Sequence, residues 1–260
     1  MWDALDSSDP VGSARTAVPE EDRDGVERLL GFMPDALQRR VLESESRRGI
    51  LNCTRQWGKS TITAAMAARE AERHRGSLTL VVSPSARQSG EFLRKAAAMA
   101  RRLGHETHGD GDNEMSLAFP NEARIIGLPG NEATVRGFSA VTLLLVDEAA
   151  RVSDELYHAI RPMLAVSGGR LWLMSTPWGQ RGFFHETWAR GGPEWERIRV
   201  PGTECPRIDG RFLAEERRVM GERWFRQEYL CEFVETGGGV FDRGAVERAF
   251  RDDVEPLCFG

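Results

Sequence analysis

Apolar positions along the chain follow two patterns, which are short continuous runs and longer segments with an apolar residue at every third or fourth position. Continuous runs are typical of strands buried on both faces of a sheet, and they occur at 49–51, 78–83, 142–146 and 171–174. Helical spacing occurs between them and before them, at 26–30, 35–42, 62–73, 86–103 and 156–164. Strands that alternate with helices predict an α/β fold, in which a mainly parallel central sheet is flanked by helices and ligands bind at the carboxyl ends of the strands.

Some segments modify this alternation. Residues 115–128 contain two short apolar stretches around Pro120, a pattern typical of a hairpin. Pro162 restricts the last helix of the alternating region, because proline cannot donate a backbone hydrogen bond. Two further helical stretches are expected near 212–220 and 222–228.

These patterns divide the chain into four parts. Residues 1–24 are rich in Ser, Asp, Pro, Gly and Glu without apolar periodicity, which predicts a mobile tail. Residues 25–200 carry the strands and helices of the core, and the arginine- and glutamate-rich residues 201–235 predict a small helical subdomain or lid. The glycines at 237–239 indicate a linker over 236–260, which is too short to form a domain.

Composition is that of an ordinary globular protein, with 40% hydrophobic and 29% charged residues among 260. The longest apolar runs are far shorter than the roughly 18 residues of a membrane span, and the acidic N-terminus lacks the design of a signal peptide. We therefore expect a cytoplasmic protein without a membrane partner. The net charge of -5 argues against a surface that is basic throughout, although it leaves room for a local basic patch.

Metal binding by cysteine or histidine is not indicated. The four cysteines, of which Cys53 lies in the loop described below, show no C-x-x-C spacing, so neither a disulfide framework nor a zinc site is expected. His105, His108, Asp110 and Asp112 are spaced like a ligand cluster, but they lie in a glycine-rich polar segment. A solvated loop is the favoured interpretation of that segment.

Residues 52–61, N-C-T-R-Q-W-G-K-S-T, read as a turn between a strand and a helix and fit the second half of the phosphate-binding pattern G-x-x-x-x-G-K-[ST]. In that pattern backbone N–H groups and a helix N-terminus surround phosphate. In this chain Lys59 would reach the β- and γ-phosphates, and Ser60 would ligate Mg²⁺. Cys53 occupies the place of the first glycine, so a residue with a Cβ is expected to adopt a conformation that glycine adopts freely. Lys59 is also one of only two lysines among the 35 Lys and Arg residues, which favours a chemical role.

Asp147 and Glu148 directly follow the apolar run that ends at 146, the context of a Walker B site. Asp147 would hold Mg²⁺ and Glu148 would orient and activate the attacking water. Solvated acids at a strand end are the alternative, which the phosphate loop upstream makes less favourable.

The form C-T-R-Q-W-G-K-S-T resembles the deviant Walker A motif of viral DNA-packaging ATPases, the terminase large subunits, in which an Arg-Gln pair precedes x-G-K-[ST]. The resemblance extends from Val26 to Phe233 through an ordered set of motifs, which are an upstream Gln, this loop, an R-G pair, the D-E pair and S-T-P. It implies a P-loop NTPase domain of the RecA/ASCE type that hydrolyses ATP with Mg²⁺ to move double-stranded DNA into a procapsid. It also implies a portal protein and a small terminase subunit as partners, and a homo-oligomeric ring that can be monomeric in isolation.

Site residues follow from the same resemblance. Gln38 would contact adenine, Arg55 would act at the nucleotide, and Arg136 would be an arginine finger that reaches a neighbour's nucleotide. Ser175, Thr176 and Pro177 match the coupling motif between the γ-phosphate and the moving part. The residues expected at ATP are Gln38, Thr54, Arg55, Gln56, Trp57, Gly58, Lys59, Ser60 and Thr61. An exposed helical Gln, surface ion pairs and local strand-end hydrogen bonds are the alternatives for these assignments.

Two other function classes remain open on the sequence, a fragment of a superfamily helicase and a nucleotide-binding assembly protein with little turnover. A helicase takes its arginine from a second motor domain, for which the residues after Pro177 are too few, whereas Glu148 and the S-T-P motif argue against an assembly protein. Terminases continue into a nuclease of the ribonuclease-H type, but this sequence ends at Gly260. Asp242, Glu247, Asp252 and Asp253 do not have the spacing of a nuclease site, so no nuclease activity is expected.

Overall fold

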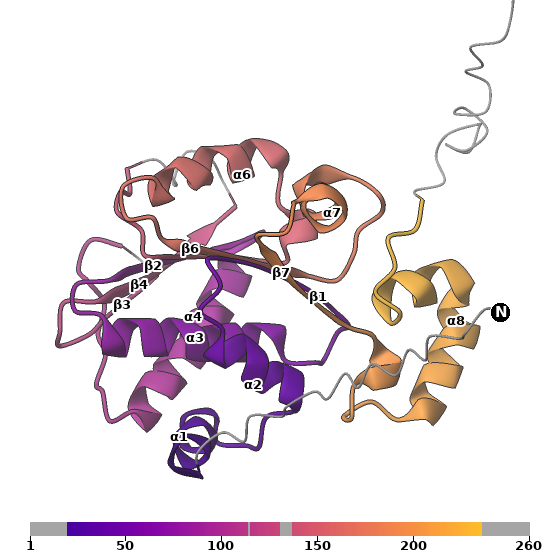
Figure 1. Ribbon diagram of the computed structural model, residues 1–260, viewed down its shortest axis with the longest axis horizontal. Coiled ribbons are helices and arrows are strands. Elements are labelled where there is room, and N and C mark those ends of the chain that lie inside the picture. Colours follow the sequence, from indigo (N-terminus) through magenta and orange to yellow (C-terminus); the bar gives the residue numbers. More distant parts are fainter. Residues whose placement is uncertain (1–19, 114, 131–136, 236–260) are drawn as a thin grey trace, which may run out of the picture.

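A computed structural model describes residues 20–113, 115–130 and 137–235 (Figure 1). Its centre is a seven-stranded sheet with the order β3-β4-β2-β5-β6-β1-β7. Every neighbouring pair is parallel except β3 and β4, which are antiparallel. The strands are β1 (Arg48–Cys53), β2 (Leu78–Ser83), β3 (Ser116–Ala118), β4 (Arg124–Pro129), β5 (Leu143–Asp147), β6 (Arg170–Ser175) and β7 (Trp195–Val200).

Helices cover both faces of the sheet. The first face carries α1 (Glu20–Leu30), α2 (Ala36–Glu43), α3 (Lys59–Arg73) and α4 (Ala86–Arg102), and the other carries α6 (Asp154–Ile160) and α7 (Gly182–Arg190) (Figure 1). The helix α8 (Gly210–Glu228) stands beside the edge of the sheet beyond β1 and β7 (Figure 1). Short 3₁₀ helices follow β5, α6 and β7, and these are η1 (Ala149–Arg151), η2 (Arg161–Leu164) and η3 (Gly202–Glu204).

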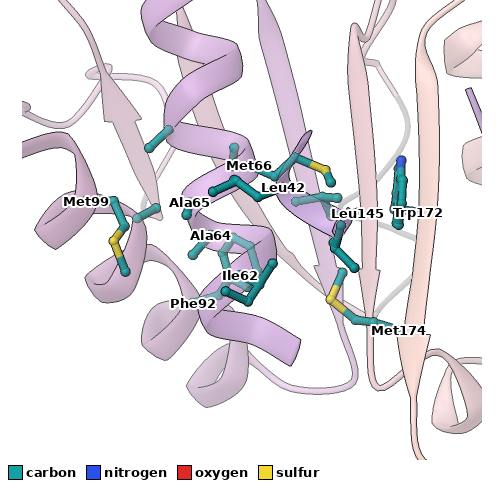
Figure 2. Packing of buried hydrophobic residues seen from close by; sticks show 14 of the residues in the cluster. Leu42, Ile62, Ala64, Ala65, Met66, Phe92, Met99, Leu145, Trp172 and Met174 are labelled. Carbon is teal, nitrogen blue, oxygen red and sulfur yellow. The ribbon is translucent and has the colours of Figure 1, made fainter. Parts of the chain in front are cut away.

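Alternate residues of the central strands enter two separate hydrophobic cores, because successive side chains of a strand point to opposite faces. In β6, Leu171 and Leu173 belong to the core under α6 and α7, whereas Trp172 and Met174 belong to the core under α1–α4. Figure 2 shows side chains of α3 between those of α4 and those of β5 and β6 in the second of these cores. A strand buried on both faces has no polar alternation, which is why the sequence shows continuous apolar runs.

The fold expected from the sequence is confirmed in class and in most elements. The predicted hairpin is the antiparallel pair β3–β4, and Pro162 lies in the 3₁₀ turn η2 that ends α6. The two helical stretches expected in the lid region are one helix, α8, interrupted at Gly221, whose φ of 79° and ψ of 162° are not helical. A glycine without Cβ adopts this conformation without strain.

Three elements differ from the expectation. β7 was not predicted, because its sequence W-E-R-I-R-V contains three charged residues, yet Trp195, Ile198 and Val200 are buried and pair β7 with β1 at the sheet edge. α7 was also not predicted. α1 begins at Glu20, inside the segment expected to be a tail, and the rest of that segment lies outside the described residues. Among the helices that the structure describes, none combines the length and apolar character needed to cross a membrane.

Candidate nucleotide site

A loop of five residues, 54–58, joins β1 to α3 at the carboxyl edge of the sheet. Gln56 and Gly58 have positive φ angles, 63° and 99°, so the chain turns sharply before α3 starts at Lys59. A Cβ at Gly58 would lie 3.1 Å from Gln38 Nε2, and glycine avoids both this contact and the strain of positive φ. The fifteen-residue α3 therefore directs its unpaired N-terminal N–H groups toward the loop, as an anion site requires.

The expectation for Cys53 is wrong. Cys53 is the last residue of β1, where it is fully buried, and it is not among the described residues with positive φ. The conformation that would favour glycine is found instead at Gln56 and Gly58. A side chain is accommodated at position 53 because the backbone there is still part of the strand.

Lys59 is 7% exposed, and its ammonium group lies at the start of the loop. Nζ donates hydrogen bonds to the backbone oxygens of Cys53, at 2.9 Å, and Thr54, at 3.1 Å. These bonds fix the cation between the end of β1 and the first turn of α3. Its charge is therefore held where the loop and the helix N-terminus would jointly attract an anion.

Ser60 and Asp147 meet across the site. The Ser60 hydroxyl donates to the Asp147 carboxylate, with both carboxylate oxygens 3.2 Å from Oγ. Burial, and next the charge of Glu148, raises the pKa of Asp147 to about 6, although Lys59 and Ser60 act in the opposite direction. A hydroxyl and a carboxylate at this spacing are ligands that suit Mg²⁺, which takes few protein ligands beside substrate phosphate and water.

Glu148 follows β5 with φ 50° and ψ 42°, a left-handed conformation that is uncommon for a residue with a side chain. This turn separates its carboxylate from that of Asp147. Glu148 Oε2 accepts from Arg151 Nη1 at 2.9 Å and from Ser175 Oγ at 3.5 Å. A strained backbone that is held by its surroundings is a frequent feature of functional sites.

Ser175 and Thr176 are both buried, at 0% and 1% exposure. Ser175 ends β6 and contacts Glu148, while Thr176 Oγ1 accepts from Arg151 Nη1 at 3.4 Å. Pro177 follows them where the chain leaves the sheet. Ser175 and Thr176 thus lie against the side chains of Glu148 and Arg151, just beyond the end of β5.

Arg55 extends from the loop toward α8. Its Nε donates to Glu228 Oε2 at 2.6 Å, and this hydrogen bond to the carboxylate is the largest cause of a raised pKa at Arg55. The Arg55 side chain is 60% exposed, and this ion pair holds it against the end of α8.

Two faces of the loop can be distinguished. A cavity of about 470 Å³ lies over its outer face, and it is lined by Phe32, Arg55, Gln56, Gly58, Lys59, Ser60, Thr61, Lys95, Glu148 and Arg207. Six residues expected at ATP line this cavity. The side chains of the other three, Gln38, Thr54 and Trp57, are buried behind the loop, at 1%, 0% and 1% exposure.

Gln38 is one of the three residues that lie behind the loop, and it supports the loop from there. Its Oε1 accepts from the Asp35 backbone N–H at 3.1 Å, completing a capping box for α2, while Nε2 donates to the Trp57 backbone oxygen at 2.7 Å. Trp57 in turn donates through Nε1 to Asp35 Oδ2 at 3.1 Å. Gln38 therefore holds the loop from behind, and its contact with adenine stays a prediction.

Several site residues were not found by sequence reasoning. Arg151 and Glu228 lie within one ion-pair chain with Glu148, and Phe32, Lys95 and Arg207 line the cavity. Lys95 could have been noticed in the sequence, because it is one of only two lysines. The others sit far from the loop in sequence, so only the fold brings them to it. Arg136, the expected finger, lies outside the described residues.

The metal-like spacing at His105–Asp112 is explained by a loop. Asp110 accepts from the backbone N–H groups of Asp112 and Asn113, at 3.1 and 2.9 Å, and from the Ser116 hydroxyl at 2.8 Å. No group of three or more His, Cys, Asp or Glu suited to a metal occurs in the described part of the chain.

A phosphate loop between β1 and α3, beside paired acids at the end of a neighbouring parallel strand, places the protein in the class of P-loop NTPase folds. The chain belongs to the family of terminase large subunits, since the model for the N-terminal part of the T4-like-virus type matches residues 50–248. A terminase large subunit of Thermus virus P23-45 is 25% identical over 249 residues, which cover 82% of this chain and 51% of the relative. The chain therefore spans about half the length of that relative.

Solved structures have the same fold. The large terminase ATPase domain of Thermus phage P74-26 superposes with a TM-score of 0.72 at 23% identity, covering 81% of this chain and 98% of that one. The large terminase of the thermophilic bacteriophage D6E, in a complex with ADP, gives a TM-score of 0.65 at 13% identity over 76% of this chain and 53% of its own.

Proposed function

We propose that this chain is the ATP-hydrolysing motor domain of a phage terminase large subunit, which couples hydrolysis to the packaging of double-stranded DNA into a procapsid. The observation that carries the proposal is the meeting of Ser60 and Asp147 at 3.2 Å beside the cavity that Lys59 and Glu148 line. Two separate motifs, 87 residues apart in sequence, converge there. Complexes of the D6E terminase with ADP and with ATP-γ-S support a nucleotide as the ligand.

Each residue has a role in this proposal. The backbone N–H groups of the loop and of the first turn of α3 surround the phosphates, and Lys59 offsets their charge. Ser60 and Asp147 would hold Mg²⁺, which neutralises phosphate charge when bound. Glu148 orients the attacking water and accepts its proton. Gln38 is assigned to adenine, and the remaining loop residues to the triphosphate.

Coupling and assembly follow from the family. Ser175, Thr176 and Pro177 transmit the state of the γ-phosphate to the moving part, and their contact with Glu148 and Arg151 supports this assignment. Arg136 acts in trans on the nucleotide of a neighbour in a homo-oligomeric ring. The partners are double-stranded DNA, a portal protein and a small terminase subunit, in the cytoplasm of the host. Residues 1–260 are not expected to have nuclease activity on DNA.

The test is a steady-state ATPase assay with and without Mg²⁺ and double-stranded DNA, made in parallel on Glu148→Gln. We expect Mg²⁺-dependent turnover that DNA stimulates, and a Glu148→Gln variant that binds ATP normally but does not hydrolyse it, since the role of Glu148 begins only with the water. Normal turnover in Glu148→Gln, or none in the unmutated protein assembled on portal and DNA, would contradict the proposal. Nicking of DNA by highly purified protein with Mg²⁺ or Mn²⁺ would contradict the expected absence of nuclease activity.

A further inference from the structure

Four charged side chains form a continuous chain between two residues that line the cavity, Glu148 and Arg55. Arg151 Nη1 donates to Glu148 Oε2 at 2.9 Å, and Arg151 Nη2 lies 3.5 Å from Glu228 Oε1. The other oxygen of Glu228 accepts from Arg55 Nε at 2.6 Å. The order Glu148, Arg151, Glu228, Arg55 thus alternates in sign and connects the end of β5 to the phosphate loop through α8.

Local structure places Arg151 beside Glu148. The positive φ of Glu148 turns the chain out of β5 into the 3₁₀ helix η1, and Arg151 N donates to Glu148 O at 2.8 Å. This bond closes a single turn over residues 148–151, so the two charged groups meet within one short stretch of chain. Arg151 is then fixed from two more sides, by Thr176 Oγ1 at 3.4 Å and by the Trp178 ring, whose centroid is 4.6 Å from Cζ.

Glu228 is held as firmly, but from another part of the fold. It is the last residue of α8, and its side chain is 10% exposed. Its backbone oxygen accepts from Thr54 Oγ1 at 3.1 Å, and the chain that follows is tied to β1 by a 2.9 Å bond from Asn52 Nδ2 to Cys231 O. The carboxyl end of α8 therefore rests directly on the start of the phosphate loop.

We propose that Arg151 is a positioning residue for Glu148, and that Glu228 sets the positions of Arg151 and Arg55 together. The inference rests on the proposed function, because Glu148 is positioned for the water that attacks ATP. Without Arg151 the carboxylates of Glu148, Asp147 and Glu228 would share a region in which Asp147 and Glu228 are buried, with less positive charge between them. Displacement of the end of α8 moves the partner of both arginines, so the lid region and the hydrolytic acid change position together.

A purely structural ion pair makes a different prediction from a positioning role. Loss of a structural pair lowers the free energy of unfolding and, through it, the fraction of active protein, so nucleotide binding and turnover fall alike. Loss of a positioning residue lowers kcat alone, because ATP binding depends on the phosphate loop and not on the orientation of Glu148.

The experiment compares Arg151→Ala, Arg151→Lys, Glu228→Gln and the double variant Arg151→Ala/Glu228→Gln. Arg190→Ala is the matched control, since Arg190 pairs with Glu186 at 3.2 Å on the exposed face of α7. Turnover is measured at saturating ATP, affinity by titration with ATP-γ-S, and folding by thermal melting. Arg151→Lys keeps the charge near Glu148 but cannot bond two carboxylates in a planar fork.

We expect Arg151→Ala to lower kcat about 10²-fold, the effect of a misplacement of roughly 1 Å, with ATP-γ-S affinity within about twofold of the unmutated protein. Arg151→Lys recovers part of the loss. Glu228→Gln lowers kcat less than Arg151→Ala. The double variant loses less than the product of the two single losses, because part of the effect of Glu228 passes through Arg151 and the rest through Arg55. Arg190→Ala leaves kcat and ATP-γ-S affinity unchanged.

The opposite outcomes are equally specific. Normal kcat in Arg151→Ala, an equal loss of affinity and kcat, or full additivity in the double variant would overturn the inference while leaving the ATPase assignment intact. Absence of turnover in the unmutated protein under assembly conditions would overturn both. If Arg151→Ala no longer shows a cooperative melting transition, it is not folded and cannot be used. The positioning role of Arg151 is then tested with Arg151→Lys and Glu228→Gln, by the same comparison of kcat with ATP-γ-S affinity.

Discussion

Lys59 and Lys95 are the two lysines of the chain, and both line the cavity over the phosphate loop. Lys59 comes from the first turn of α3, and Lys95 from α4, which packs beside it. Arginine provides nearly all the other positive charge, as in the planar pairs of Arg55 and Arg151 with carboxylates. A compact ammonium group suits a position between backbone oxygens and phosphate better than a guanidinium does.

Lys59→Ala is expected to abolish hydrolysis and to weaken ATP binding, because it removes the cation that offsets the β- and γ-phosphate charge. Steady-state turnover and titration with ATP-γ-S measure the two effects. Glu148→Gln serves as the comparison variant, because we expect it to retain ATP binding. A Lys59→Ala protein with normal turnover would remove Lys59 from the site.

Asp110→Asn tests a carboxylate that organises a loop. Burial alone would raise the pKa of Asp110, but hydrogen bonds from Asn113, Ser116 and Asp112 outweigh it and lower the pKa to about 2. A carboxylate whose folded pKa lies below its unfolded value stabilises the fold above the unfolded pKa, and this contribution is lost as pH falls through the folded pKa.

We therefore expect Asp110→Asn to be less stable than the unmutated protein at neutral pH, with a difference that shrinks between about pH 4 and pH 2. Urea unfolding at several pH values measures it. Asp112→Asn is the control, since Asp112 contributes its backbone N–H to Asp110, at 3.1 Å. A stability difference that stays constant down to pH 2 would contradict this account.

At the scale of elements, the position of the site depends on β1, which carries the loop and lies between β6 and β7. Gly49 of β1 pairs with Trp172 of β6, and a Cβ at Gly49 would overlap the buried Trp172 ring. Trp172 donates through Nε1 to the Ser46 backbone oxygen at 3.3 Å, which holds the ring in this place. Glycine is needed here for close approach and not for an unusual backbone angle.

Gly49→Ala is expected to destabilise the protein by about 1–3 kcal/mol, because the ring or the strand must shift in a close-packed core. Gly90→Ala is the control, since Gly90 lies in α4 with no atom within 4 Å of an added Cβ, and alanine favours helix there by up to about 1 kcal/mol. Denaturant unfolding compares the free energies. Equal stability of the two variants would contradict the packing account.

At the scale of the whole molecule, the cavity of about 470 Å³ is built from the loop, the first turn of α3, α4, Phe32, Glu148 after β5, and Arg207 from the segment before α8. Arg55 lines this cavity and is held there by its ion pair with Glu228. Arg207 also lines the cavity and donates to the Trp57 backbone oxygen at 2.6 Å, and an arginine finger would be a further source of positive charge for phosphoryl transfer. Arg136 of a neighbouring subunit is the candidate that follows from the family.

If Arg136 acts in trans, Arg136→Ala lowers turnover by something near the 10³–10⁵ ascribed to arginine fingers, while ATP affinity of the isolated subunit stays nearly unchanged. Turnover per subunit of the unmutated protein rises with protein concentration. Arg136→Ala and Lys59→Ala mixed together recover activity that neither has alone, because one supplies an intact phosphate site and the other an intact finger. Failure to complement in a mixture that co-assembles, on portal or DNA where needed, would return Arg136 to a surface ion pair.

The sequence by itself determined the class of fold and the chemical centre of the site. Strands buried on both faces produce apolar runs, and the helices between them keep a regular period, so both are visible without coordinates. The loop at Gly58–Ser60 and the acids Asp147 and Glu148 are each set by neighbours in sequence, because a phosphate loop needs its glycine and lysine at fixed spacing. Arg136 was identified only through the resemblance to terminase large subunits, and its role stays a prediction.

Only the tertiary structure decided on which face of the loop each expected residue lies and what joins the loop to α8. Gln38, Thr54 and Trp57 were all expected at ATP, yet their side chains are buried behind the loop. Glu228 reaches Arg55 across 173 residues of sequence, and its charge has no periodic or local pattern that marks it. An ion pair between distant segments is fixed by how the sheet and α8 pack, and packing geometry is not encoded in any short stretch of the chain.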